Sequence, residues 1–448
     1  LAGDALTTGN TNTAVGYQAL SADTLGDRNV AIGLKALATQ NFTTSTDSYN
    51  IGIGYDAGND ITTGTRNVLI GALAGDALTD ADNNTALGYA ALSSDTLGSN
   101  STAFGYTALL NQNFTTATDS HNTAVGHATG LAITTGTLNT LIGSLAGDAL
   151  TAADSNTAIG YVTLSSDTRG ERAIAIGEGA LFSQNFTTET NNYNVAIGYN
   201  AGYSVSTGVS NTLVGGLAGD ALTDSDYNVA IGNQALTTDT LGSKSVAIGF
   251  EALKTQNFNT ATDSNNTAVG YQAGTAVTTG IRDTFIGSGA GDSIQASSEN
   301  TAVGYNALTN DTTGSQSTAF GAYALQTQNY STGTNSFNTA AGYAAGTGAD
   351  NVAVGYAAGN AVTTGIKNTF VGRSAGATTD DGQENASLGY NALGGGNCGD
   401  GNVAVGNNAA QVCTGDANTC IGNNAGNAIS TGDNNLVLGK DAGRSGSP

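Results

Sequence analysis

One short motif recurs along the whole chain at nearly regular spacing, and it limits the possible folds more than any other feature. The motif reads Asn-(Thr/Val)-Ala-(Val/Ile)-Gly-Tyr-x-Ala-(Leu/Gly), and its glycine occurs 25 times between Gly16 and Gly439. The glycine spacings follow 17, 21, 17 and 17 residues, a set of 72 that repeats up to Gly304. So short a period is typical of a solenoid, in which each coil is buried only by stacking on the next. The sequence therefore predicts an all-β parallel solenoid of about 25 coils.

The spacing also predicts how the solenoid is divided along the chain. We expect a regular solenoid with the 72-residue super-repeat over residues 1–372. A continuing solenoid with irregular coils and all three cysteines should cover residues 373–448. The chain starts in the middle of a repeat, at Leu1 and without a methionine, so we expect a processed chain or a fragment.

Residues around the motif glycine indicate where each strand lies. Counted from the glycine, position −1 is apolar in every coil, position −3 is mostly β-branched, and position −2 is mostly alanine. This pattern favours a strand whose alternate residues point to opposite faces. No charge occurs at these positions, so we expect both faces to be buried. We expect the strands that carry Ala14, Ala31, Ala86 and Ala103 to lie nearest an axis shared between chains.

Two further positions of the coil have a clear character. Position +1 is often tyrosine but carries Glu178, Arg373 or Lys440 in some coils, so it should reach solvent. Position −4 is asparagine in 20 of the 25 coils. Stacked asparagine amides can hydrogen-bond along a column of strands. We therefore predict an asparagine ladder along the solenoid.

The charge balance excludes several classes of function. The chain carries 35 acidic and 12 basic residues, a net charge of −23, whereas nucleic-acid binding needs a basic surface. The same balance argues against docking on anionic membranes, and no apolar run is long enough to insert into a membrane. The two histidines have no partnered nucleophile in the sequence. We expect a protein that is not an enzyme, with no catalytic residues and no cofactor.

The 21-residue coils contain the most conspicuous local feature, an insertion with an aromatic residue. Insertions in a solenoid map to loops on one face, and that face is often the binding face. Two interpretations are open: a buried aromatic plug under a wide turn, or a stripe of receptor contacts. The aromatic residues are Phe42, Phe114, Phe186, Phe258 and Tyr330.

Acidic turns raise the question of calcium. Asp80 with Asp82, and Asp224 with Asp226, place carboxylates at alternate residues, a pattern that hard cations accept. Other copies of the repeat lose these acids, and solvated turn residues are the alternative interpretation. The four aspartates are weak metal candidates.

The three cysteines lie close together in the irregular part of the chain. Cys398 and Cys413 precede matching turns of adjacent coils, and stacked coils are close enough for a disulfide. We predict a Cys398–Cys413 disulfide, which would fit an extracellular or virion setting. Cys420 occupies position −2 and should be a buried thiol.

Segments 12–20, 84–92 and 300–308 carry the motif in full. The motif resembles the repeats of bacteriophage tail fibre shafts, which often precede a self-cleaving intramolecular chaperone. It is similar, less closely, to the left-handed parallel β-roll heads of trimeric autotransporter adhesins, whose repeats read Ser/Asn-x-Ala-(Ile/Val)-Gly. Both resemblances imply a homotrimer. The chain departs from the adhesins in its longer coils and its super-repeat, and from full-length fibres in lacking the chaperone, which cleavage after Pro448 would explain.

From these features we expect a structural shaft of a viral tail fibre or spike, located on a virion or outside the cell. Such a shaft would contribute to host attachment through repeated weak contacts with a surface glycan or protein. One alternative is a bacterial adhesin head that binds host matrix or glycans. Another is a self-assembling extracellular filament.

Overall fold

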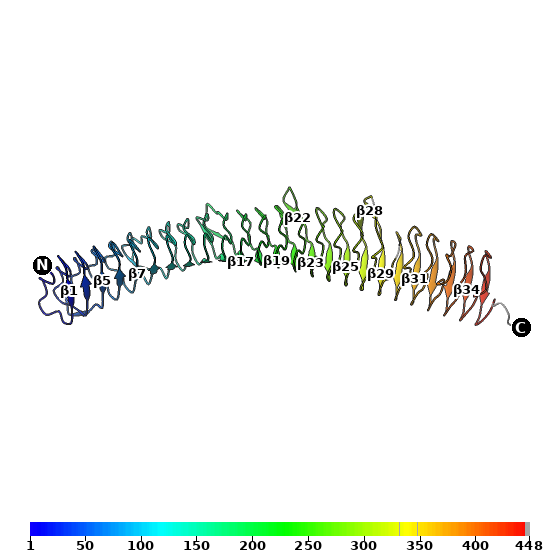
Figure 1. Cartoon of the computed structure of the whole chain (residues 1–448), viewed down its shortest axis with the longest axis horizontal. Helices are drawn as coiled ribbons and strands as arrows, with labels where there is room; N and C mark the ends of the chain where they lie inside the picture. Colours follow the sequence, from blue (N-terminus) through cyan, green and yellow to red (C-terminus); the bar gives the residue numbers. More distant parts are fainter. Residues whose placement is uncertain (331, 347, 444–448) are drawn as a thin grey trace. The chain divides into compact units, whose positions relative to one another are not determined.

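The computed structural model describes residues 1–330, 332–346 and 348–443. Across these residues the chain is a parallel β-solenoid of about 25 turns without any helix, as the motif spacing predicts. Figure 1 shows the turns following one another, each with one strand of the main sheet. The chain divides into two compact units, Leu1–Tyr227 and Asn228–Pro448. The division expected at residue 372 falls inside the second unit.

Each strand of the main sheet covers positions −3 to −1 of one coil. In the first unit these strands are β1 (Thr13–Val15), β3 (Val30–Ile32), β5 (Ile51–Ile53), β6 (Val68–Ile70), β7 (Thr85–Leu87), β9 (Thr102–Phe104), β11 (Thr123–Val125), β12 (Thr140–Ile142), β13 (Thr157–Ile159), β15 (Ile174–Ile176), β17 (Val195–Ile197) and β18 (Thr212–Val214). Neighbours pair in parallel and in register, so that Ala14 lies opposite Ala31 and Val15 opposite Ile32.

The second unit continues the same pattern. Its strands are β19 (Val229–Ile231), β21 (Val246–Ile248), β23 (Thr267–Val269), β24 (Thr284–Ile286), β25 (Thr301–Val303), β27 (Thr318–Phe320), β29 (Thr339–Ala341), β30 (Val352–Val354), β31 (Thr369–Val371), β32 (Ala386–Leu388), β33 (Val403–Val405), β34 (Thr419–Ile421) and β35 (Leu436–Leu438). The shorter coils near the end keep this register, as the pairing of Ala404 with Cys420 shows.

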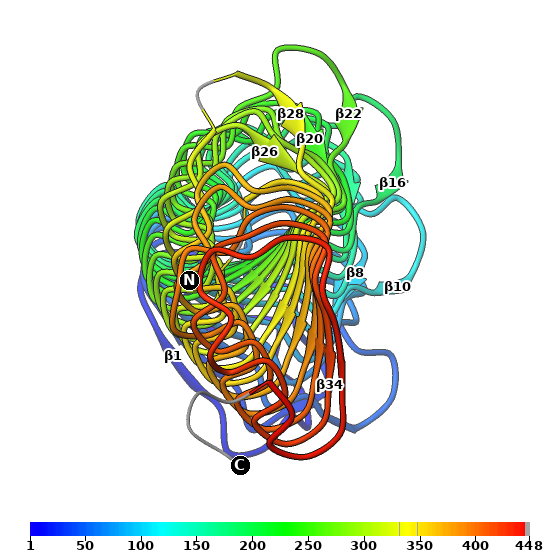
Figure 2. The ribbon, with the colours of Figure 1, turned by 90° about the vertical axis from the view of Figure 1, so that its right-hand side faces the viewer.

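The 21-residue coils add short two-stranded pairs outside the main sheet. These are β2 (Gly26–Asp27) with β4 (Thr46–Asp47), β8 (Gly98–Ser99) with β10 (Thr118–Asp119), β14 (Gly170–Glu171) with β16 (Thr190–Asn191), β20 (Gly242–Ser243) with β22 (Thr262–Asp263), and β26 (Gly314–Ser315) with β28 (Thr334–Asn335). Figure 2 shows β10, β16 and β22 at the feet of loops that extend beyond the outline of the regular coils. Each pair ties an inserted loop to the preceding coil.

The motif glycine is required because the next coil approaches it too closely for a side chain. Gly33 has a φ of +134°, and a Cβ on it would lie 2.3 Å from the carbonyl oxygen of Gly54. Gly71 meets Gly88 in the same way, again at 2.3 Å. Only glycine tolerates both the backbone angle and the contact, which explains why the motif keeps it in every coil.

The predicted asparagine ladder is confirmed. Asn50 is fully buried, its Nδ2 donates to the carbonyl of Gly64 at 2.7 Å, and its Oδ1 accepts from the backbone N–H of Asn67 at 2.9 Å. Asn67 repeats both contacts with Ala81 and Asn84. Each ladder asparagine therefore bonds to a turn 14 residues later in the sequence and to the backbone of the next ladder residue. These bonds satisfy the buried polar groups.

The 72-residue super-repeat reflects whether the large residue inside a coil stands at position −2 or at position +4. Leu69, at position −2, fills the interior between Gly58 and Gly75, where an added Cβ would lie within 2.8 Å of a Leu69 methyl. In a coil where −2 is Ala31, position +4 is instead Leu37, which is fully buried. Close packing demands this compensation between large and small residues. It accounts for the alternation of two leucines and two glycines at position +4.

The single chain buries only one face of each strand, the face that carries the −2 residues. The placement of these strands nearest a shared axis stays a prediction. Ala31, Ala86 and Ala103 have no exposed surface in the single chain, because they point into the interior of their own coils. The alternation of the strand is as predicted. The narrow interior selects the small −2 residues, so the bulkier −3 and −1 residues occupy the outer face.

Candidate interaction surface

The outer face of the main sheet exposes an apolar row at position −1 and a row of threonine and aliphatic residues at position −3. We call positions −3 and −1 of all coils the outer rows. Seven of their large members in the first unit are 37 to 56% exposed: Val15, Ile32, Leu87, Phe104, Ile142, Ile174 and Ile197. Those of the second unit are exposed to a similar or greater degree: Ile231, Ile286, Phe320, Val354, Leu388, Ile421, Leu436 and Leu438.

The outer rows carry no charge in any coil, and threonine is their only polar residue. Parallel sheets are usually covered on both faces, whereas here one face of the sheet lacks a cover from its own chain. Monomeric soluble proteins rarely expose contiguous apolar patches larger than a few hundred square ångströms. The outer rows therefore have the character of an interface.

A row of aromatic side chains at position +1 runs beside the outer rows. Its exposure agrees with the sequence prediction. Tyr106 stacks on Tyr89 with ring centroids 5.3 Å apart and on His127 at 5.5 Å. In the second unit Tyr343 stacks on Tyr356 in the same way. Both faces of Tyr106 are thus covered by its neighbours, so this ring has no free face for a sugar.

Charged residues at position +1 fit into the same row. The guanidinium carbon of Arg373 lies 5.4 Å from the ring centroid of Tyr356 and 5.8 Å from that of Tyr390. A cation held between two aromatic rings gains a favourable electrostatic contact. The row therefore continues through Arg373 without a gap.

The second unit also has an apolar depression in its outer rows. It has a volume of about 200 Å³ and is lined by Val371, Ala386, Leu388 and Val405, among others. Ala386 stands at position −3, where most coils have threonine or valine, and its small side chain leaves the space. A protruding apolar side chain would fit there.

The aromatic residues of the insertions lie inside the coil. Phe42, Phe114, Phe186 and Phe258 are only 5 to 6% exposed, and Tyr330 is half-buried. This placement agrees with the buried-plug interpretation. The four phenylalanine rings are not available as receptor contacts, so any such contact in these coils would come from the exposed loop residues around them.

A buried carboxylate holds each plug, and the sequence analysis missed it. Asp95 is fully buried: its Oδ1 accepts from the N–H groups of Gly98 and Phe114, both at 3.0 Å, and its Oδ2 from Gln112 Nε2 at 2.6 Å. The Oε1 of Gln112 then accepts from the ladder residue Asn122. Equivalent aspartates are Asp23, Asp167, Asp239 and Asp311. The available signal was an aspartate 17 residues before each glutamine of the insertions.

Tyr330 differs from the four phenylalanines because the coil that follows it is short. Asn338 has no full-length coil beyond it, and its Nδ2 donates to Gln328 Oε1 at 2.8 Å and to the Tyr330 hydroxyl at 3.4 Å. Burial raises the pKa of Tyr330. The hydroxyl thus supplies an acceptor that the ladder needs at this point.

The weak metal candidates take part in contacts between coils. Asp80 accepts from Thr63 Oγ1 and Asp82 from the backbone of Thr65, both at 2.6 Å. Asp224 and Asp226 make the equivalent contacts with Thr207 and Val209, both at 2.7 Å. No group of three or more histidine, cysteine, aspartate or glutamate residues in the described part of the chain is arranged to hold a metal.

All three cysteines are buried thiols in the structure, as predicted for Cys420. Cys398 and Cys413 lie on adjacent coils, and Cys398 Sγ donates to the carbonyl of Cys413 at 3.2 Å. A hydrogen bond from Cys398 lowers the pKa of Cys413, and the same contact raises the pKa of Cys398. Burial raises the pKa of Cys420 to about 11. The Cys398–Cys413 disulfide stays a prediction.

No helix in residues 1–330, 332–346 and 348–443 is long and apolar enough to cross a membrane. No profile of a known protein family matches the chain, and no curated protein is similar enough in sequence to count as a match. The functional inference therefore rests on the outer rows and the tyrosine row beside them.

Proposed function

We propose that the chain is a structural shaft that assembles with further copies of itself through its outer rows. The observation that carries this proposal is the uncharged outer face of both units, with an apolar residue at position −1 of every coil. A face of this length would bury far more surface than a transient contact needs. An identical copy is the partner that offers a matching apolar residue at every coil.

A homotrimer is the assembly that we propose. Each coil contributes a strand of only three residues, so the apolar face is narrow and long. Three such faces around a common axis would cover one another, with equivalent coils at the same level. The resemblance of the motif to trimeric fibre and adhesin repeats supports the same number of chains.

We further propose that the shaft belongs to a viral tail fibre or spike, on a virion or outside the cell, and is not an enzyme. Its contribution to attachment would be avidity, because a repeated weak contact gains strength when many copies engage one surface. The inserted loops recur once in each 72-residue unit and keep a Gln-Asn-aromatic start. They are the proposed place of contact with a host glycan or protein.

The test of assembly is the mass in solution by light scattering. The wild-type chain should give about three times 44.2 kDa. The combined substitutions Ile142→Asp, Ile197→Asp and Ile286→Asp should reduce the mass to one chain, because desolvated charges at an apolar interface are costly. The matched control replaces exposed loop residues of three insertions, Thr116→Asp, Thr188→Asp and Thr260→Asp, and should remain assembled.

A wild-type protein that stays at 44.2 kDa at all concentrations would overturn the proposal. A mass that rises without limit as concentration increases would favour the self-assembling filament instead. Circular dichroism of both triple variants checks that the coils remain folded.

A further inference from the structure

One position of the asparagine ladder carries an aspartate out of phase with the super-repeat. Serine or alanine replaces the ladder asparagine once in each of four 72-residue units, always at the same place: Ser101, Ala173, Ser245 and Ser317. Asp283 lies at a different place in the 72-residue unit. The residues at its place in the preceding units are all asparagine: Asn67, Asn139 and Asn211.

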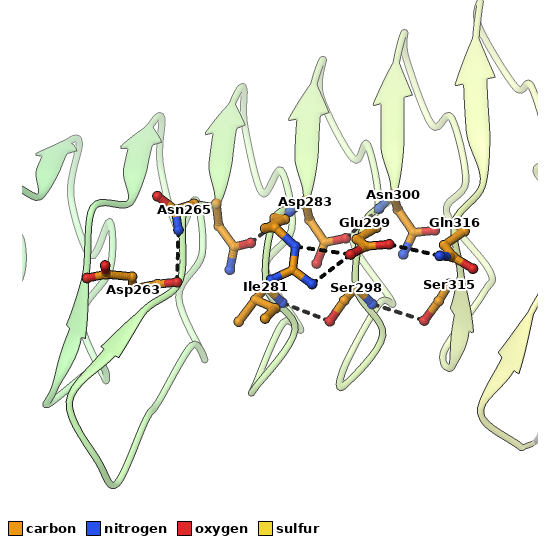
Figure 3. A network of polar contacts seen from close by, with 11 residues as sticks. Asp263, Asn265, Ile281, Asp283, Ser298, Glu299, Asn300, Ser315 and Gln316 are labelled. Carbon is orange, nitrogen blue, oxygen red and sulfur yellow. Dashed lines mark hydrogen bonds and ion pairs between the residues drawn. The ribbon is translucent and has the colours of Figure 1, made fainter.

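The contacts of Asp283 along the ladder are those of an asparagine. Its backbone N–H donates to Asn266 Oδ1 at 2.9 Å, and its Oδ1 accepts from the backbone N–H of Asn300 at 2.8 Å. Figure 3 shows Asp283 and Asn300 on successive coils, with Glu299 beside them. The first oxygen of the carboxyl group therefore occupies the place of an amide oxygen.

The second oxygen occupies the place of an amide nitrogen. At the equivalent positions, the Nδ2 atoms of Asn67, Asn139 and Asn211 donate to the carbonyl oxygen 14 residues later, at 2.7 to 2.8 Å. For Asp283 that carbonyl belongs to Ser297. A Cβ added to Gly280 would lie 2.8 Å from Asp283 Oδ2 and 2.2 Å from Ser297 O. Around Gly365 the same two places are filled by Asn368 Nδ2 and Gly382 O, at 3.1 and 2.4 Å.

Two acceptor oxygens, Asp283 Oδ2 and Ser297 O, thus face each other where the ladder normally has a donor and an acceptor. Asp283 is fully buried, and neither its Oδ2 nor the nearby Ser297 Oγ has a hydrogen-bond partner. An ionised carboxylate at this place would face a carbonyl oxygen and find no hydrogen-bond donor in the chain, which is costly. A single hydrogen on Oδ2 would restore the pattern of the other positions.

The charged groups around Asp283 do not supply a counter-ion. Arg282, on its own coil, and Glu299, on the next, are exposed and form an ion pair of 2.6 Å with each other. Glu299 also accepts from Gln316 at 2.9 Å. The ladder neighbours Asn266 and Asn300 are neutral. The guanidinium and the carboxylate largely cancel, so the buried carboxyl group gains little from either.

We propose that Asp283 is a proton-dependent latch of the second unit, held as a neutral carboxylic acid whose Oδ2–H donates to the carbonyl of Ser297. Loss of this proton converts a hydrogen bond into a repulsion between two oxygens. The coils of β24 and β25 then become easier to open. The latch makes the opening of these coils sensitive to pH. The coils of the first unit that have asparagine at the equivalent position are insensitive to pH.

The sign of the effect is opposite to that of most aspartates. Burial raises the pKa of Asp283 from 3.8 to about 7, against the opposing hydrogen bonds from Asn300. Since the folded state binds the proton more tightly, its contribution to stability is complete below the unfolded-state pKa. This contribution decreases as pH rises to about 7, and above that pH the stability no longer depends on the group. The ratio of folded to unfolded coils falls by up to about a thousandfold over this interval.

The test compares the wild-type chain with Asp283→Asn between about pH 4 and about pH 8. Hydrogen exchange of the Thr284 and Thr301 amides, which bond to the next coil, reports the opening of these coils after correction for intrinsic exchange. The variant should be more protected than wild type at the alkaline end, and the two should converge at the acidic end. A difference that does not vary with pH would overturn the proposal.

Two further measurements test the protonation of Asp283. Asn139→Asp, at the equivalent position of the first unit, should acquire the same pH dependence for the coil of β12. Isotope-edited infrared difference spectra of wild type minus Asp283→Asn should contain the carbonyl band of a neutral carboxylic acid at about pH 5. A carboxylate band alone, or protection at about pH 8 that returns with added Na⁺ or Ca²⁺ only when Asp283 is present, would overturn it.

Discussion

On strand β9 the middle residue, Ala103, is fully buried, while its neighbour Phe104 reaches solvent although it is much more apolar. The same contrast between the inner −2 row and the outer rows recurs along both units. Hydrophobicity therefore does not decide which side of this strand forms the core of a coil. Volume decides it, because the interior has room only for alanine, or for a larger residue placed between glycines such as Gly58 and Gly75.

The contrast also separates what each row does. The inner row and the ladder beside it hold the coils of one chain together. The outer rows contribute little to that stack and are proposed to hold separate chains together. Substitutions in the inner row should consequently impair folding, and substitutions in the outer rows should impair assembly.

The largest effect is expected from Ala86→Glu in the inner row. A charge without a counter-ion in this closed interior should destabilise the coil by several kcal/mol, because it is both too large and unpaired. Thermal unfolding by circular dichroism measures the loss. Thr85→Glu, one residue away in the outer rows, is the control and should leave the coil folded. A stable Ala86→Glu variant that only fails to assemble would reverse the assignment of the two rows.

The next largest effect is expected from Asp95→Ala, which removes the carboxylate behind an aromatic plug. The N–H groups of Gly98 and Phe114 and the amide of Gln112 would lose their acceptor, at a cost of roughly 2 to 5 kcal/mol. Limited proteolysis should then cut within the insertion between β8 and β10. Thr116→Ala, at an exposed position of the same loop, should leave the cleavage rate unchanged. Equal cleavage of the two variants would show that the carboxylate does not hold the loop.

A disulfide between Cys398 and Cys413 would stabilise the end of the second unit by about 3 kcal/mol, because closing a loop of about 15 residues lowers the entropy of the unfolded chain. Thiol labelling under denaturing conditions should find one free thiol of the three in protein kept under air. That thiol should disappear in Cys420→Ala. Three labelled thiols, or a link that includes Cys420, would contradict the predicted pairing.

The smallest effect on folding is expected from Phe104→Ser in the outer rows. The ring is about half exposed already, so its loss should cost the single chain about 1 kcal/mol or less. Its effect should instead appear in assembly, as a lower mass on dilution than the wild-type chain. A large fall in the unfolding temperature at dilutions where both proteins are monomeric would show that this row supports the coil itself.

Features that repeat with each coil could be predicted from the sequence. The strands at positions −3 to −1, the asparagine ladder and the burial of Cys420 each follow from one residue type in one place. The direction of the rows could not be predicted, because Ala31 and Ile32 are both apolar and only the interior volume distinguishes them. The contacts of Asp95 were missed because they join residues up to 19 positions apart through side chains. The role of Asp283 could not be predicted, because it depends on which of its side-chain atoms faces the Ser297 carbonyl.

The stacking of coil on coil in constant register has a genetic consequence. Gly88 and Gly160 are 72 residues apart, and each is followed by a tyrosine, Tyr89 and Tyr161. Removing residues 89–160 would join Gly88 to Tyr161 and bring together coils that already have the right partners. Unequal recombination between repeats of the gene can thus add or remove four coils in one step while the stacking register is kept. The number of coils can change in this way without a substitution in the coils that remain.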